Sequence, residues 1–137
     1  MNGTVVNVVG LGYIGLPTAM MMASHGVHVI GTDYNPELVK KLQAGQLTFQ
    51  EDGLETLLEK AQKTNIVFST EYSDHADIYI VSVPTPYDKK SKRIDPNYLV
   101  AAVKQVLSVC PKGAIIVVES TVSPGTMDKY IRPLLEE

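Results

Sequence analysis

The sequence has little cysteine, no excess of basic charge and no long apolar run. Its one cysteine, Cys110, excludes a disulfide framework and the paired spacing of a Cys/His metal site, and the three histidines are scattered. We therefore expect no bound metal. Lysine and arginine total 12 against 15 acidic residues, a net charge of −3, so the basic excess of an electrostatic nucleic-acid-binding protein is missing.

The apolar segments are also too short for a membrane protein. No run of about 18 apolar residues occurs, so we expect no transmembrane helix. The N-terminus lacks the basic region and cleavage site of a signal peptide. One cysteine fits a reducing, cytoplasmic setting. The 137 residues, 45% of them hydrophobic, are enough for one domain with its own core.

Glycine, in contrast, is concentrated after the first apolar segment. Residues 5–9 are nearly continuous in valine, which is typical of a strand buried on both faces. The pattern G-x-G-x-x-G follows at Gly10, Gly12 and Gly15, opening a helix expected over 13–24. Gly10 permits a tight turn, Gly12 lets a pyrophosphate approach the backbone, and Gly15 lets the helix pack against the sheet. Because the free N–H groups of a helix N-terminus attract phosphate, this stretch predicts a dinucleotide-binding turn.

An acidic residue follows at the spacing that a dinucleotide site requires. The second expected strand, 27–32, ends in Asp33, 18 residues after Gly15. A carboxylate at that strand tip accepts hydrogen bonds from the adenosine ribose and repels a 2′-phosphate, which favours NAD over NADP. The alternative is that Asp33 only shapes a turn, because Asn35-Pro36 then starts the next helix.

The remaining apolar segments alternate between strand-like runs and segments with the spacing of an amphipathic helix. Further strands are expected at 66–68, 76–83 and 113–118, and further helices at 36–44, 54–62, 95–110 and 124–137, the last capped by Ser123. This alternation predicts the α/β class, with a Rossmann-type doubly wound parallel sheet and helices on both faces, in a single domain. Residues 87–94 hold four basic side chains and are expected to form a solvated loop, with contact to an anionic substrate as the alternative.

Two strand exits carry the remaining candidate ligand contacts. The strand 76–83 runs into prolines, which cannot continue a central ladder, so the chain must leave the sheet there. Because the carboxyl ends of strands line the ligand crevice of an open α/β sheet, Ser82, Val83 and Thr85 are candidate cofactor contacts. The alternative is a rigid exit without a ligand. Glu119, Ser120 and Thr121 follow the strand 113–118 and point toward the same crevice, so Ser120 and Thr121 are further candidate cofactor contacts. Thr121 binds either a ligand or its own turn.

Three motifs in this order resemble one enzyme family. Val-Val-Gly-Leu-Gly-Tyr-Ile-Gly-Leu-Pro at 8–17, Val-Pro-Thr-Pro at 83–86 and Glu-Ser-Thr-Val-Ser-Pro-Gly-Thr at 119–126 are similar to the N-terminal domain of the UDP-glucose and UDP-N-acetylmannosamine dehydrogenases. The similarity covers nearly the whole chain. The first two motifs, followed by Asp95-Pro96, look closer to the N-acetylhexosamine branch. Such enzymes oxidise a sugar C6 hydroxyl to a carboxylate in two hydride transfers, reducing two NAD.

The resemblance implies a role for each matching residue. The pyrophosphate is expected on Gly10, Gly12, Tyr13, Ile14 and Gly15. Asp33 is expected to bind the ribose. The adenosine and nicotinamide halves of the cofactor are expected beside Val83, Pro84 and Thr85. Thr121 also matches a family threonine near the nicotinamide and the catalytic water. Glu119 stands where relatives often carry another residue, and it receives no role.

The resemblance further implies that the catalytic half is not in this chain. The family's nucleophilic cysteine, central helix and UDP-binding domain lie beyond a first domain of this size, and Cys110 is not in the context of that cysteine. We therefore expect a fragment or truncated product, residues 1–137, that binds NAD but does not turn over a UDP-sugar. The full-length enzyme is expected to bind a UDP-sugar and to form a homodimer or larger oligomer.

Three other functions remain open. A UDP-glucose 6-dehydrogenase would share the same three motifs. A non-catalytic NAD-sensing module would not need the motif at 119–126. A hydroxyacid or hydroxyacyl dehydrogenase would share the glycine turn, but the Val-Pro-Thr-Pro exit argues against it.

Overall fold

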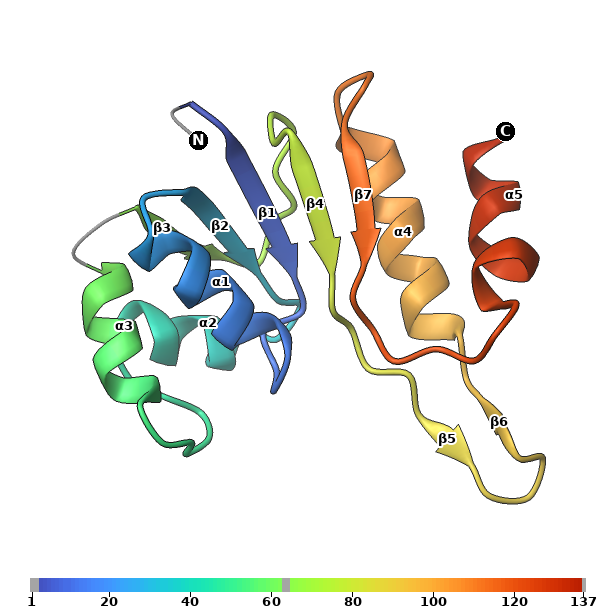
Figure 1. Cartoon of the computed structure of the whole chain (residues 1–137), viewed down its shortest axis with the longest axis horizontal. Helices are drawn as coiled ribbons and strands as arrows, with labels where there is room; N and C mark the ends of the chain where they lie inside the picture. The colour runs from blue at the N-terminus through green and yellow to red at the C-terminus, as the bar shows by residue number, and fades with distance from the viewer. Residues whose placement is uncertain (1–2, 63–64, 137) are drawn as a thin grey trace.

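The computed structural model describes residues 3–62 and 65–136 and contains one parallel sheet of five strands (Figure 1). The strand order is β3-β2-β1-β4-β7. The strands are β1 (Val5–Val9), β2 (His28–Thr32), β3 (Ile66–Ser69), β4 (Ile78–Val81) and β7 (Ile115–Val118). The chain builds outward from β1 to β3 and then crosses back to β4, so the strand order reverses between β1 and β4. A ligand crevice is expected at the carboxyl ends of these two strands.

Helices cover both faces of the sheet (Figure 1). One face carries α1 (Gly15–Ser24), α2 (Pro36–Gln43) and α3 (Leu54–Gln62). The other carries α4 (Asn97–Val109), the π-helical turn η1 (Met127–Ile131) and α5 (Arg132–Leu135). This arrangement confirms the predicted doubly wound fold.

The central strand β1 is buried on both sides, as its run of valines predicts. Val6 and Val8 lie in the core cluster beneath α1, whereas Val9 lies in the cluster beneath α4. Each fully buried side chain of this size contributes about 1.5–3 kcal/mol of transfer free energy. The strand therefore joins the two cores, and the glycine turn follows directly from this buried strand.

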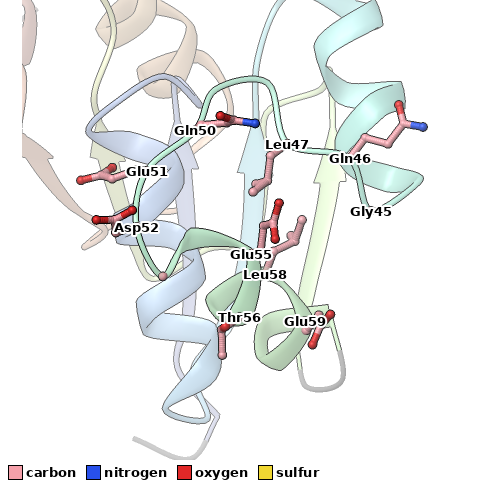
Figure 2. A pocket seen from close by; sticks show the side chains of 11 residues that line it. Gly45, Gln46, Leu47, Gln50, Glu51, Asp52, Glu55, Thr56, Leu58 and Glu59 are labelled. Carbon is pink, nitrogen blue, oxygen red and sulfur yellow. The ribbon is translucent and has the colours of Figure 1, made fainter.

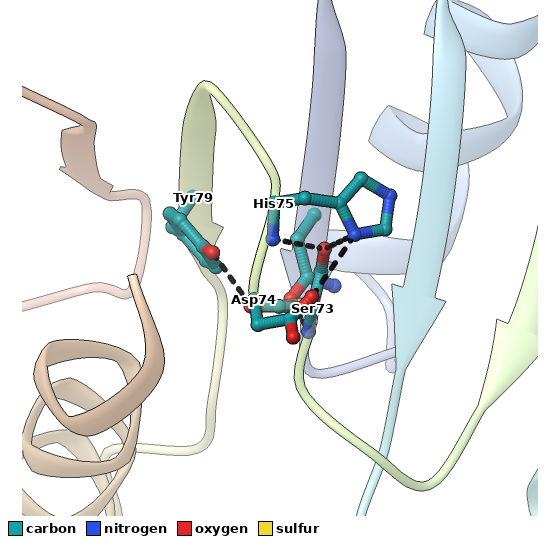
Figure 3. A network of polar contacts seen from close by, with 5 residues as sticks. Ser73, Asp74, His75 and Tyr79 are labelled. Atoms are coloured by element: carbon teal, nitrogen blue, oxygen red, sulfur yellow. Dashed lines mark hydrogen bonds and ion pairs between the residues drawn. The ribbon is translucent and has the colours of Figure 1, made fainter. Parts of the chain in front are cut away.

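Asn7 is the polar exception in this strand, and it fixes the connection between β3 and β4. Its side chain is fully buried and donates to the Ile30 carbonyl and to Thr32 Oγ1, both at 2.8 Å. Its Oδ1 atom accepts a hydrogen bond from the Ser73 N–H at 3.0 Å. Figure 3 shows the Ser73 backbone also bonded by the Tyr79 hydroxyl, at 2.5 Å. The connection is thereby held against the sheet next to the carboxyl end of β2.

Residues 87–94 are largely exposed to solvent, as predicted, but they do not form an irregular loop. They form an exposed antiparallel hairpin, β5 (Tyr87–Asp88) and β6 (Arg93–Ile94), which extends beyond the carboxyl edge of the sheet (Figure 1). The turn depends on Lys92, whose φ of 55° lies in the left-handed region that favours glycine. The hairpin was not predicted because each strand has only two residues and the turn lacks the usual glycine or asparagine.

The last helix also begins later than predicted. Its first turn, η1, starts at Met127, and the residue at the N-cap position is Thr126 rather than Ser123. The Ser123 carbonyl instead accepts the Thr126 N–H at 3.1 Å. Gly125 has a φ of +86°, which a right-handed helix cannot contain, so the helix cannot extend back to Pro124. The predicted cap at Asn35 is confirmed, because its side chain accepts the N–H groups of Glu37 and Leu38.

Candidate cofactor site

The three glycines of the turn meet different surroundings. A Cβ atom on Gly15 would lie 1.7 Å from the Gly10 carbonyl oxygen, and one on Gly10, whose φ is +97°, would lie 2.6 Å from the Ser82 carbonyl oxygen. A Cβ atom on Gly12 would meet nothing within 4 Å. Gly10 and Gly15 are therefore required by the fold itself, whereas the missing side chain of Gly12 leaves open space at the mouth of the turn.

The same turn presents backbone donors without acceptors. Within the described parts of the chain, no hydrogen bond engages the N–H groups of Gly12, Tyr13 or Ile14. These groups lie at the N-terminus of α1, whose first turn holds no acidic residue. Free N–H groups and the positive end of a helix dipole together suit an anionic group, so the turn fits a pyrophosphate.

Asp33 holds this turn from the tip of β2. Its Oδ2 atom accepts the Leu11 N–H at 3.0 Å, and its Oδ1 atom accepts the Asn35 N–H at 3.0 Å. The turn-shaping alternative for Asp33 is thus present in the structure. A carboxylate has about four acceptor sites, so these two bonds leave capacity for ribose hydroxyls.

Burial, and secondarily the Asp33 carboxylate, raise the pKa of the Tyr72 hydroxyl above its ordinary value.

The structure brings together the two strand exits that the sequence placed apart. The Ser120 hydroxyl donates to the Val83 carbonyl at 2.8 Å, and the Thr85 hydroxyl donates to the Thr121 carbonyl. Between the strands, the Glu119 N–H donates to the Val81 carbonyl at 2.8 Å. The two exits therefore form one connected surface beside the reversal point, and both Thr121 and Pro84 are exposed on it.

Glu119, to which the sequence assigned no role, connects three elements. Its Oε1 atom accepts a hydrogen bond from Thr18 of α1 at 2.8 Å, and its Oε2 atom accepts one from Ser82 after β4 at 2.9 Å. The side chain is half-buried at the end of β7. Thr18 and Glu119 are 101 residues apart, so no local pattern reveals their contact. The only hint in the sequence is a carboxylate placed directly after an apolar strand.

The connection between α2 and α3 also reaches the glycine turn, which the sequence did not predict. The rings of Tyr13 and Phe49 lie 4.7 Å apart between centroids, with an angle of 44° between their planes. This contact places the connection between α2 and α3 beside the proposed phosphate site.

A cleft of about 890 Å³ lies along the same connection and α3 (Figure 2). Its lining includes the carboxylates of Glu51, Asp52, Glu55 and Glu59, and it includes none of the residues predicted for the cofactor. Four carboxylates repel a dinucleotide that carries two negative phosphates. The cleft is therefore a poor place for the cofactor, whereas the free N–H groups of the glycine turn suit its phosphates.

The described ranges contain no group of three His, Cys, Asp or Glu side chains that could hold a metal ion. Cys110, at the end of α4, is half-buried and packs against the second core cluster. In the part of the chain that the structure describes, the helices are all too short or too polar to cross a membrane.

Comparisons with known proteins give the family of the chain. Residues 4–137 match the model of the UDP-glucose/GDP-mannose dehydrogenase family, NAD binding domain. The UDP-N-acetyl-D-mannosamine dehydrogenase of Methanococcus aeolicus is 46% identical over 125 residues, which are 89% of this chain and 28% of that protein.

Two solved structures share the fold. The UDP-N-acetyl-mannosamine dehydrogenase Cap5O from Staphylococcus aureus is 40% identical with a TM-score of 0.90, over 97% of this chain and 32% of that one. The GDP-mannose dehydrogenase from Pseudomonas aeruginosa, a ternary complex, is 28% identical with a TM-score of 0.86, over 96% of this chain and 31% of that one. The chain thus spans about a third of the length of these relatives. The chain belongs to the UDP-glucose/GDP-mannose dehydrogenase family and is its NAD-binding domain.

Proposed function

We propose that the crevice between β1 and β4 seats NAD across the point where the strand order reverses. The pyrophosphate lies on Gly10, Gly12, Tyr13, Ile14 and Gly15. The observation that carries this proposal is the set of unpaired N–H groups at Gly12, Tyr13 and Ile14, beside the open space at Gly12. The adenosine ribose lies on Asp33, whose carboxylate already faces the same turn through Leu11.

The nicotinamide half lies over the joined exits of β4 and β7. The residues proposed to contact the cofactor there are Val83, Pro84, Thr85, Ser120 and Thr121. NAD supplies the hydride acceptor at this place. Thr121 is proposed to support the reaction next to the nicotinamide. This role is supported by an exposed side chain on a backbone that the Thr85 hydroxyl holds in place.

We propose that the whole protein oxidises the C6 hydroxyl of a UDP-N-acetylhexosamine, UDP-N-acetylmannosamine in particular, to a uronate with two NAD. The relatives that carry this name are 36–46% identical to the chain. Because the chain spans about 30% of their length, the sugar-binding and nucleophilic groups are assigned to the remaining domains. A cytoplasmic homodimer or larger oligomer is the form proposed for that protein.

The test is an assay of the whole protein with UDP-N-acetylmannosamine and with UDP-glucose, following NADH formation. The proposal expects two NADH for each UDP-N-acetylmannosamine and little reaction with UDP-glucose. The opposite preference would favour a UDP-glucose 6-dehydrogenase. NAD binding without NADH formation from either sugar would favour a non-catalytic NAD-sensing module.

A further inference from the structure

Glu119 is a carboxylate that accepts hydrogen bonds but forms no ion pair with any residue that the structure describes. Both of its oxygens accept hydrogen bonds from neutral hydroxyl groups, those of Thr18 and Ser82. The ion pairs found among residues 3–62 and 65–136 are His75–Asp74, Arg132–Asp128 and Arg132–Glu136, and none of them includes Glu119. Its hydroxyl partners orient the carboxylate but bring no opposite charge.

A charge in this position affects the binding of a ligand beside it. A carboxylate that is half removed from water loses hydration; its hydrogen bonds offset part of that loss, and a nearby charge of opposite sign offsets more of it. Glu119 follows β7 and is joined to the exit of β4, the half of the sheet opposite to Asp33. In a doubly wound sheet the dinucleotide spans the reversal point, so the ribose at Asp33 directs the other nucleotide toward β4 and β7.

The two redox states of that nucleotide differ in charge. The oxidised nicotinamide ring carries a positive charge, and the reduced ring is neutral because it has taken up a hydride. We propose that Glu119 selects the oxidised cofactor, since its carboxylate attracts the pyridinium ring and not the dihydropyridine ring. This inference rests on the proposed placement of NAD in the crevice between β1 and β4.

Such selection suits an enzyme that carries out two oxidations in succession. After each hydride transfer the reduced cofactor must leave, and an oxidised one must take its place. The loss of the ring charge on reduction removes the attraction to Glu119, so the exchange is favoured in the direction that the reaction requires.

The test compares the dissociation constants of NAD⁺ and NADH, measured by calorimetry on the wild-type chain and on Glu119→Gln. Glutamine has nearly the same shape and can still bond Thr18 and Ser82, but it has no charge. The ratio Kd(NAD⁺)/Kd(NADH) is expected to rise about 3- to 10-fold in Glu119→Gln. Glu59→Gln removes an exposed charge on α3 and should leave the ratio unchanged.

A second variant separates the charge from its hydrogen bonds. Thr18→Val removes one hydrogen bond to Glu119 and keeps the charge, so both dissociation constants can change but their ratio should not. If Glu119→Gln does not fold, the salt dependence of the ratio Kd(NAD⁺)/Kd(NADH) in Glu119→Asp and in the wild type tests the inference instead. The ratio of each should rise with salt concentration, because salt screens the attraction to the pyridinium.

The outcomes distinguish this inference from the proposed function. If the wild-type chain binds neither cofactor, the placement of NAD itself fails. If it binds both and Glu119→Gln leaves the ratio unchanged, the inference about Glu119 is wrong while the proposed function stands. A ratio that changes equally in Thr18→Val would show a structural effect and would also contradict the inference.

Discussion

The Asp33 carboxylate accepts a hydrogen bond from the Leu11 N–H at 3.0 Å, across 22 residues of sequence. One side chain therefore both shapes the glycine turn and is proposed to bind the ribose. The two roles are physically linked, since the bond that orients the carboxylate also fixes the first residue after Gly10. Variants at Asp33 must separate a loss of ligand contact from a loss of the turn.

Asp33→Ala is expected to lower the affinity for NAD by roughly 10- to 100-fold, because hydrogen bonds to a charged group contribute about 1.5–3 kcal/mol. Asp33→Asn should lose less, since its amide oxygen can still accept the Leu11 N–H. The difference between NAD and NADP affinity should also narrow in Asp33→Asn. Calorimetry measures the NAD and NADP affinities of the wild type and of both variants. Asp52→Ala, in the cleft lined by four carboxylates, is the control. Unchanged NAD affinity in Asp33→Ala would refute the ribose assignment.

Two glycine substitutions should separate binding from folding. In Gly12→Ala the new methyl group enters open space, so the free energy of unfolding should stay within about 1 kcal/mol of the wild type while NAD affinity falls. In Gly15→Ala the new Cβ lies 1.7 Å from the Gly10 carbonyl oxygen, which should cost about 3 kcal/mol of stability. Urea unfolding and calorimetry measure the two effects. Normal NAD binding by Gly12→Ala would contradict the proposed phosphate site.

Asn7→Ala should destabilise the fold by about 2–4 kcal/mol. The variant leaves the Ser73 N–H, the Ile30 carbonyl and Thr32 Oγ1 without their buried partner, and each unsatisfied group costs about 1–3 kcal/mol before relaxation. Urea unfolding gives the free energy. The matched control is Asn97→Ala, at an exposed position of α4, which should change the free energy of unfolding by less than about 0.5 kcal/mol. Equal losses in the two variants would rule out the special role of Asn7.

Stability should decrease in alkaline solution because of Tyr72. Burial and the Asp33 carboxylate raise the pKa of Tyr72, so the folded chain holds the phenolic proton more tightly than the unfolded chain does. This stabilisation is complete below the ordinary tyrosine pKa of about 10 and is lost as the pH rises through the higher folded pKa. Denaturant unfolding at increasing pH should show a smaller decrease for Tyr72→Phe. An identical decrease in both proteins would show that Tyr72 is not responsible.

The 137-residue chain alone should form no NADH from NAD and UDP-N-acetylmannosamine. Its one cysteine, Cys110, packs against the core at the end of α4, away from the joined strand exits. Absorbance of NADH is the measurement, and Cys110→Ser should bind NAD as the wild type does. Clear NADH formation would show that this chain already holds a complete catalytic site.

The sequence predicted the parts of this fold that depend on local signals. The valine run of β1, the glycine turn and Asp33 are close in sequence, and together they form the first βαβ unit, in which the cofactor site is proposed. The hairpin was missed because the left-handed turn at Lys92 has no residue-type signature. At the last helix, Ser123-Pro124 has the sequence pattern of a helix cap, but the positive φ of Gly125 prevents the helix from starting there.

The candidate site was predicted less completely because part of it depends on long-range contacts. Thr85 and Ser120 were chosen for their places after strand ends. The hydrogen bonds from Thr85 to the Thr121 carbonyl and from Ser120 to the Val83 carbonyl depend on the order of the strands in the sheet. The contact of Thr18 with Glu119 was beyond sequence reasoning, since nothing local relates a threonine in α1 to a carboxylate after β7.

The central claim is that NAD lies in the crevice between β1 and β4, and amide NMR spectra of the 137-residue chain titrated with NAD test it most directly. The account predicts shifts at Gly10, Gly12, Gly15 and Thr121, with little change at Glu55 and Glu59 of the acidic cleft. Shifts confined to that cleft, or no shifts at saturating NAD, would contradict it.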